Sequence, residues 1–318
     1  MNSSRPIGII CHGGAGTVED PAAAAAGLKP AIEEGYRLLL QGAPVLDVVV
    51  TAVRMLEDSG LFNAGTGSDL TIDEHVEMDA AVMTQDGRFG GVCCIAGVRN
   101  PILVAEKVMT DTDHLLLAGE GAFQFAQRAG LAGFHEISER ARRRLARVRE
   151  QGSPFFPKLN QQLRVGDERR SAAPETDTTL GTVGAVAIDR QGKVAAATSS
   201  GGVAGKMRGR VGDSALPGAG TYAAPAGAVS CSGHGEGIIR ILLAKDIVDR
   251  MTNLPGATAL TLALAEARRK KVMCGAVGFD ARGGICYGHT TPHFIWGYKI
   301  ANRLFMFTDG AKSAPKVG

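Results

Sequence analysis

Apolar positions along this chain follow two different periods. Over residues 22–41 and 44–57 they recur at helical spacing, and in the second stretch Val45, Val49 and Leu56 share one face. Short runs of small and β-branched residues instead alternate with a period of two, as strands do. The predicted strands are 6–11, 77–83, 88–96, 184–188 and 275–279. The further predicted helices are 101–109, 115–129, 236–251 and 257–271.

The order of these elements indicates the fold class. Gln85-Asp86-Gly87 is a hairpin signal between two predicted strands, and the segments 184–194 and 275–285 both have a strand–turn–strand pattern. A glycine-rich turn is expected at residues 13–16, and a glycine-punctuated loop at 61–67. Strands joined by hairpins and accompanied by helices favour an α+β protein, with antiparallel sheets covered by helices.

Composition adds limits on partners and location. The 318 residues can bury a sizeable core, and 43 glycines with few aromatic residues favour closely packed layers. The net charge of +3 is spread over a long chain and argues neither for nor against a nucleic-acid partner, and we expect none. No signal peptide or membrane-spanning run is visible, which predicts a cytoplasmic protein without a membrane partner. The six cysteines form no CxxC pair, which favours free thiols over a catalytic cysteine.

One segment departs from the rest of the chain. Residues 136–175 combine many arginines with several prolines and glycines. A basic run can bind nucleic acid. The alternative, which we favour, is a short solvated helix followed by a loose linker.

The linker leads to an internal Gly-Thr step, Gly181-Thr182, at the start of a small-residue strand. A mid-chain threonine has no assured base. If the bond before it is cut, its own α-amine can accept the proton of its hydroxyl. Gly181 tolerates the strained backbone that an N→O acyl shift needs. Thr179-Leu180-Gly181 is a rival start of the motif, and the family resemblance described below favours Thr182 through its spacing to Ser200.

Several motifs in order complete a family pattern. They are His12–Gly16, Phe62–Gly67, Glu77–Ala80, Gly181–Asp189, Ala195–Gly202, Gly209–Ser214 and Ser232–Glu236. In this series the chain resembles the isoaspartyl peptidase/L-asparaginase family, the plant-type asparaginases, which are N-terminal-nucleophile hydrolases. The resemblance covers nearly the whole chain except about 135–176.

The resemblance implies a four-layer αββα sandwich. It implies one domain, 1–318, that cuts itself into an α subunit, 1–181, and a β subunit, 182–318. The α-subunit tail would span about 135–181. Two such αβ units would form a dimer.

The resemblance also implies a nucleophile centre. Thr182 would be the nucleophile, and Ser200 stands where most relatives carry a second threonine bonded to it. Asn63 would support this region. Ser keeps the hydroxyl of threonine but loses the methyl that restrains its rotamer.

Substrate binding and oxyanion stabilisation fall to later residues. Arg210 and Asp213 would be the substrate clamps, because a guanidinium suits an α-carboxylate and a carboxylate suits an α-ammonium. Ser232 and Gly233 would form the oxyanion hole. His234 is interpreted as structural, because a free α-amine already supplies the base.

No organic cofactor or catalytic metal is implied. In the family a loop wraps a structural sodium ion with backbone carbonyls. The corresponding residues here are Leu56, Glu57, Ser59, Phe62, Ala64 and Thr66. Residues 108–114, with His114, align with a second loop that confers potassium dependence in some relatives.

The leading hypothesis is therefore an autoprocessing hydrolase of two small-molecule classes, β-aspartyl dipeptides and L-asparagine, through a β-aspartyl-enzyme. A glycosylasparaginase-like amidohydrolase is a second hypothesis. An uncleaved, non-catalytic protein that binds aspartate-like ligands through Arg210 and Asp213 is a third. Residues 290–299 match the family poorly and are expected to shape the leaving-group pocket.

Overall fold

The computed structural model describes residues 6–16, 20–163 and 181–308. Its strands are β1 Gly8–Gly16, β2 Met78–Thr84, β3 Phe89–Ile95, β4 Leu116–Ala118, β5 Val183–Ile188, β6 Val194–Ser200, β7 Thr221–Ala224, β8 Gly227–Gly233, β9 Cys274–Asp280, β10 Ile285–His289, β11 His293–Ile300 and β12 Arg303–Phe307. Its α-helices are α1 Pro21–Leu40, α2 Val45–Asp58, α3 Pro101–Asp111, α4 Gly119–Arg128, α5 Glu139–Gln151, α6 Pro157–Leu163, α7 Gly235–Ile241, α8 Leu243–Met251 and α9 Gly256–Arg269.

Within the described residues the strands form two sheets. The larger has eight strands in the order β12-β11-β1-β5-β6-β2-β3-β4, and the smaller has the order β10-β9-β8-β7. All neighbours are antiparallel except β3 and β4. The predicted hairpins β2–β3, β5–β6 and β9–β10 are confirmed.

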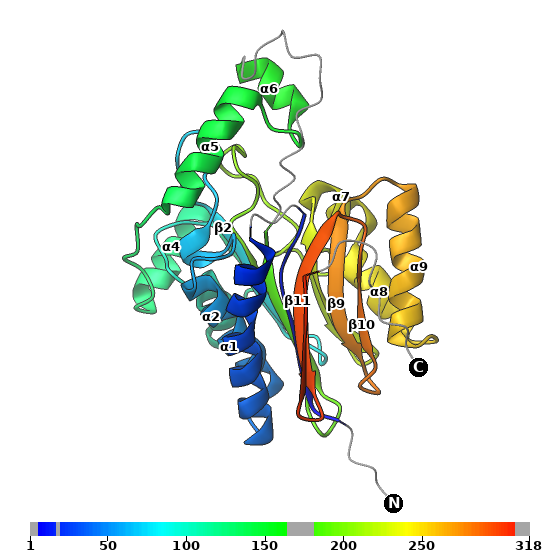
Figure 1. Cartoon of the computed structure of the whole chain (residues 1–318). Coiled ribbons are helices and arrows are strands. Elements are labelled where there is room, and N and C mark those ends of the chain that lie inside the picture. Colours follow the sequence, from blue (N-terminus) through cyan, green and yellow to red (C-terminus); the bar gives the residue numbers. More distant parts are fainter. Residues whose placement is uncertain (1–5, 17–19, 164–180, 309–318) are drawn as a thin grey trace, which may run out of the picture.

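The elements stack in four layers, as Figure 1 shows. Helices α1, α2 and α3 pack on the outer face of the large sheet, and α8 and α9 pack on the outer face of the small one. An apolar cluster fills each of these helix–sheet interfaces, and a third cluster lies where the two sheets face each other. The predicted αββα sandwich of the α+β class is confirmed.

Small residues let the two sheets approach closely at the centre. Gly184 on β5 lies opposite His12 on β1. A Cβ atom placed on Gly184 would lie 2.0 Å from Ser230 Oγ of the small sheet and 2.4 Å from His12 Nε2. Glycine is therefore required where these polar side chains cross between the sheets.

Three predicted elements were wrong in part. The first residues of the predicted helix 115–129 form strand β4, Leu116–Ala118, and the helix itself, α4, begins at Gly119. The expected turn at residues 13–16 is the end of β1, which keeps its pairing with β11 through an irregularity between His12 and Gly14. Helix 236–251 is broken at Leu242, whose φ of 47° is left-handed and separates α7 from α8. A left-handed residue between two helical patterns leaves no periodicity signal, so the sequence could not indicate it.

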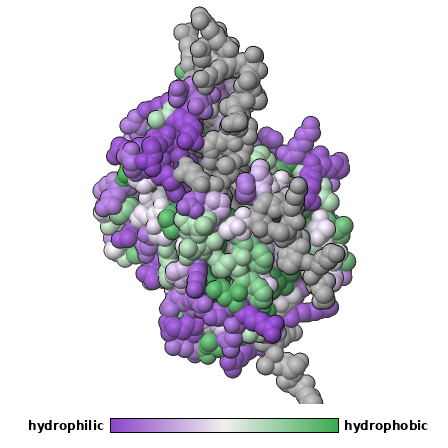
Figure 2. All heavy atoms as spheres, viewed as in Figure 1, coloured by the Kyte–Doolittle hydropathy of each residue, from purple (hydrophilic) through white to green (hydrophobic). Residues whose placement is uncertain are grey.

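The arginine-rich segment is more ordered than predicted. The solvated helix is confirmed as α5, which buries Ala141 and Leu145 against Leu70. Figure 2 shows a strongly hydrophilic surface over α5. The linker, however, does not begin after this helix, because α6 follows it. The remainder of the predicted linker, together with Thr179, lies outside the described residues.

Candidate active site

The proposed nucleophile lies where the chain enters β5. Thr182 is nearly buried, and its Oγ donates a hydrogen bond to Ser200 Oγ at 3.1 Å. The β5–β6 register pairs Val183 with Ser199, which brings the two hydroxyls together at the hairpin's open end. The hydroxyl pair predicted from their spacing is present.

Asn63 holds the backbone around this pair. Its Nδ2 donates to the carbonyl oxygen of Gly202 at 2.7 Å, and its Oδ1 accepts from the backbone of Asp69 at 2.8 Å. A Cβ atom placed on Gly181 would lie 2.9 Å from the Asn63 Cβ. The residue before Thr182 therefore has no room for a side chain, which is a second reason for glycine there.

A buried histidine lies on the other side of Thr182. His12 Nδ1 lies 3.1 Å from the Thr182 carbonyl oxygen, and Nε2 lies 2.9 Å from Ser230 Oγ. Burial lowers the pKa of His12 to about 3. Since a carbonyl only accepts, Nδ1 carries the proton and Nε2 accepts from Ser230.

That contact continues across the sheets. Ser230 Oγ is 2.7 Å from Thr198 Oγ, and Thr221 Oγ is 2.7 Å from the same Thr198 oxygen. Thr198 therefore lies inside β6 within a hydroxyl network. Four strands contribute to this network, so no local spacing could have predicted it.

The predicted oxyanion residues end β8. Ser232 Oγ accepts from the backbone of Ala15 at 3.0 Å, which leaves its own proton available to donate. Gly233 has a φ of 146°, and a Cβ atom there would lie 2.3 Å from the Met273 carbonyl oxygen. This strained conformation turns the chain from β8 into α7.

Arg210 already has a partner that the sequence did not predict. Its Nε and Nη2 donate to Glu236 Oε1 and Oε2 at 3.0 and 2.8 Å. His234 Nε2 lies 3.1 Å from Glu236 Oε2. Despite the cost of burying its carboxyl, the hydrogen bonds from His234 and Arg210 hold the pKa of Glu236 far below its usual range. Glu236 lies in the Ser232–Glu236 motif. A charged residue beside a glycine there was the signal in the sequence that could have indicated a role for Glu236 in the site.

Asp213 is a buried carboxylate next to Arg210. Its Oδ2 has no hydrogen-bond partner among the described residues. Burial raises the pKa of Asp213 to about 7, although the charge of Arg210 opposes this effect. A Cβ atom on Gly235 would lie 2.7 Å from Arg210 Nη2 and 3.0 Å from Asp213 Oδ1. The two predicted clamps thus face one small space, with opposite charges.

Two further residues fix the loop that carries the clamps. Asp79 accepts from the backbone of Cys94 at 2.8 Å and of Gly212 at 2.7 Å. Lys206 is fully buried, and its Nζ donates to the carbonyls of Glu77 and Gly201 at 2.6 and 2.9 Å. Both were missed as site residues, because their partners are backbone atoms, which leave no side-chain pattern in the sequence.

The carbonyl loop after α2 suits a hard cation. The carbonyl oxygens of Leu56, Glu57 and Ala64 each accept one hydrogen bond from within the loop, and each keeps a second lone pair. A Cβ atom on Gly67 would lie 2.1 Å from the Phe62 carbonyl oxygen. Carbonyl lone pairs are the ligands that hard cations bind, and in this loop Arg140 already donates to the Gly67 carbonyl.

The described residues contain no cluster of three or more His, Cys, Asp or Glu side chains that could hold a metal ion. No helix in the described ranges is long and apolar enough to cross a bilayer. All six cysteines are free thiols, as predicted.

Comparison with known proteins agrees with the site. A family model described as asparaginase matches residues 5–307. The chain is 40% identical over 303 residues to the plant-type L-asparaginase of Pyrococcus horikoshii, covering 92% of this chain and 96% of that protein. It is 38% identical over 315 residues to the isoaspartyl peptidase of Escherichia coli, covering 91% and 92%. It is 42% identical over 257 residues to an isoaspartyl peptidase/L-asparaginase of Xenopus laevis, covering 78% and 76%.

The matches run through the sandwich and through every motif of the site, so this chain belongs to the asparaginase family of N-terminal-nucleophile hydrolases.

Proposed function

We propose that this protein cuts itself between Gly181 and Thr182 and then hydrolyses L-asparagine and β-aspartyl dipeptides. The observation that carries the proposal is the contact between the Thr182 and Ser200 hydroxyls directly after a glycine that cannot be larger. A threonine so placed becomes an N-terminal nucleophile once the preceding bond is broken.

The reaction follows from the groups around Thr182. Its Oγ attacks the side-chain carbonyl carbon of the substrate, and its α-amine takes the hydroxyl proton. Charge then develops on the carbonyl oxygen, where the Ser232 hydroxyl and the Gly233 backbone would donate. The C–N bond breaks, and the amine passes the proton to the leaving nitrogen. Water then attacks the aspartyl ester, releases aspartate and restores the Thr182 hydroxyl.

Arg210 and Asp213 support the substrate class. Opposite charges facing one space suit a free α-carboxylate and α-ammonium. Asparagine and β-aspartyl dipeptides share that head group and differ only in the leaving amine. The names of the relatives include both activities.

Two accompanying proposals rest on the family. A sodium ion would bind the carbonyl loop after α2, supported by the second lone pairs of the Leu56, Glu57 and Ala64 carbonyls. Raising sodium at constant ionic strength should raise the melting temperature of the wild type. Two αβ units would form a dimer, which sedimentation measures directly. Neither outcome depends on turnover.

A gel and N-terminal sequencing test the main proposal. Purified wild-type protein should give two fragments, the smaller beginning at Thr182. Thr182→Ala should stay intact and inactive because the hydroxyl is gone, whereas Thr182→Ser should still cut. Thr179→Ala is the matched control and should cut normally. An intact wild type that hydrolyses asparagine would refute the mechanism, and an intact, inactive one that binds aspartate would favour the non-catalytic alternative.

A further inference from the structure

The arm formed by α5, α6 and the loop between them, residues 139–163, reaches the site from the opposite half of the chain. Arg140 Nη2 donates to the Gly67 carbonyl at 3.2 Å in the loop that carries Asn63. Arg144 Nη1 lies 2.8 Å from Asp69 Oδ1, and both side chains are buried. The arm is therefore fixed to the loop that carries Asn63 by one buried charge pair and one hydrogen bond to a backbone carbonyl.

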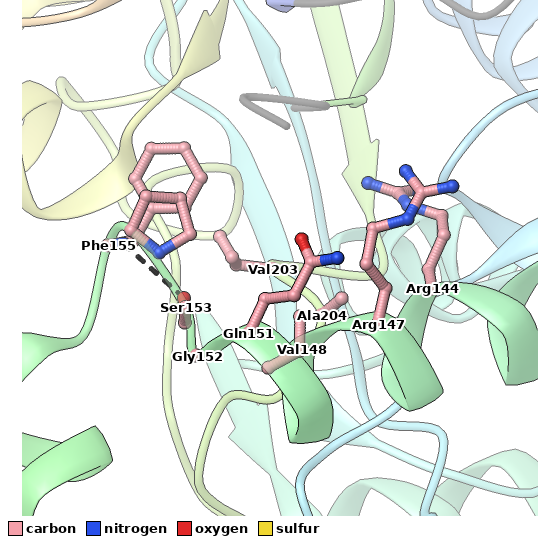
Figure 3. Close-up of a pocket in the computed structure, with 10 residues that line it drawn as sticks. Arg144, Arg147, Val148, Gln151, Gly152, Ser153, Phe155, Val203 and Ala204 are labelled. Atoms are coloured by element: carbon pink, nitrogen blue, oxygen red, sulfur yellow. Dashed lines mark hydrogen bonds between the residues drawn. The ribbon is translucent and has the colours of Figure 1, made fainter. Parts of the chain in front are cut away.

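The loop of the arm contacts His234, which adjoins the partner of the substrate clamp Arg210. Phe155, in the loop after α5, stacks on the His234 ring with centroids 5.3 Å apart and planes at 26°. Figure 3 shows Phe155, Val203 and Val148 around a narrow notch between the arm and the 203–204 loop. The notch holds only about 30 Å³, so the arm lies close to residues 203–204.

His234 connects this stack to the guanidinium. It contacts Glu236 at 3.1 Å, and Glu236 holds two nitrogens of Arg210. The exposed side-chain fractions fall from 32% for Glu236 and 26% for His234 to 12% for Arg210. Phe155 covers one face of the His234 ring, and so keeps water from that face of the residue that contacts the Glu236 carboxylate.

We propose that Phe155 is a positioning residue for the substrate's α-carboxylate, acting through His234 and Glu236 on the orientation of Arg210. This inference rests on the proposed function. If the chain is cut before Thr182, Phe155 lies on one fragment, and His234, Glu236 and Arg210 lie on the other. The first fragment then completes the substrate-binding end of the second.

Steady-state kinetics with L-asparagine test the inference. Phe155→Ala should raise KM about two- to tenfold, the range expected for losing an aromatic stack, and change kcat less than twofold. Phe155→Trp should restore KM because a ring remains. Phe156→Ala is the matched control: it removes the neighbouring ring, which makes no ring contact with His234, and should leave KM unchanged. The inhibition constant of L-aspartate should rise in parallel in Phe155→Ala.

Opposite outcomes are equally specific. An unchanged KM in Phe155→Ala overturns the inference, as does an equal rise in Phe156→Ala, which would indicate general loosening of the arm. Should the wild type show no turnover, the proposed function fails separately. Calorimetry then tests the inference through the dissociation constant of L-asparagine, which should change among the same variants by the ratios expected for KM.

Discussion

At the scale of single residues, the sequence predicted the reacting groups better than the groups that hold them. Thr182, Ser200 and Asn63 are in the predicted places because each belongs to a short motif with fixed spacing. His12 and Glu236 also lie in recognisable motifs, but their partners come from other strands or from a second motif. Such contacts exist only after folding, so no pattern along the chain could assign them.

Ser200 should matter for turnover more than for folding. Ser200→Ala removes the oxygen that accepts the Thr182 hydroxyl proton in the described contact. We expect kcat to fall about a hundredfold. Ser200→Thr should keep or raise kcat, because the added methyl restrains the rotamer. Equal kcat in wild type and Ser200→Ala, with matching melting temperatures, would exclude this role.

Asp213 predicts a pH dependence of affinity. Its pKa in the free protein is raised to about 7 by burial, so its charge is present above that pH and lost below it. The KM for L-asparagine should therefore rise as pH falls from about 8 to 6, while kcat responds less, because the bound ammonium keeps the carboxyl ionised. In Asp213→Asn the KM should be high and flat over this range. A wild-type KM that does not change between these pH values would contradict the clamp assignment.

At the scale of elements, hydrophobic periodicity and turn residues predicted most helices and hairpins. The errors in the predicted boundaries lie where an unusual backbone conformation or a contact distant in sequence determines the local structure. The glycines after His12 continue a strand because β11 pairs with them. Helix α5 has few apolar residues, and it is held by arginines that find carbonyls and carboxylates elsewhere. An arginine that anchors a helix and one that faces water look alike in sequence.

The Arg144–Asp69 pair should anchor α5 energetically. In the uncut Thr182→Ala background, in which the protein unfolds as a single chain, Arg144→Leu removes a buried cationic partner of the Asp69 carboxylate. The free energy of unfolding should fall by about 3–5 kcal/mol in urea titrations. Arg142→Ala, on the exposed face of the same helix, is the control and should change it by less than about 0.5 kcal/mol. Adding Asp69→Asn to Arg144→Leu should recover much of the loss; no recovery would mean that the charge is not the cause.

At the scale of the whole molecule, the proposed cut separates strands that remain neighbours. Strand β1 of the first fragment lies between β11 and β5 of the second, and β2 pairs with β6 across the same division. Neither fragment has a complete large sheet alone. The fold class was predictable from the order of hairpins and helices. The interleaving of the strands was not, because strand order depends on pairing between segments that are far apart in the sequence.

The cut protein should therefore behave as one body. The two fragments should co-elute in gel filtration after extended dilution and separate only when denaturant unfolds the sheets. Fragments that separate in native buffer would show that the interleaved order does not hold in solution. The uncut Thr182→Ala protein provides the elution reference.

The position of β5 between β1 and β6 also means that the cut can occur only after the sheet has folded. Thr182 meets Ser200 and Asn63 only when the middle of the large sheet has assembled, so a chain that misfolds keeps its peptide bond. The nick would be a permanent mark of a completed fold. It would also make unfolding effectively irreversible. Fragments that have separated would have to meet again by diffusion, and their exposed strand edges would compete by pairing wrongly. Each molecule would then be assembled a single time, and its working life would end with its first unfolding.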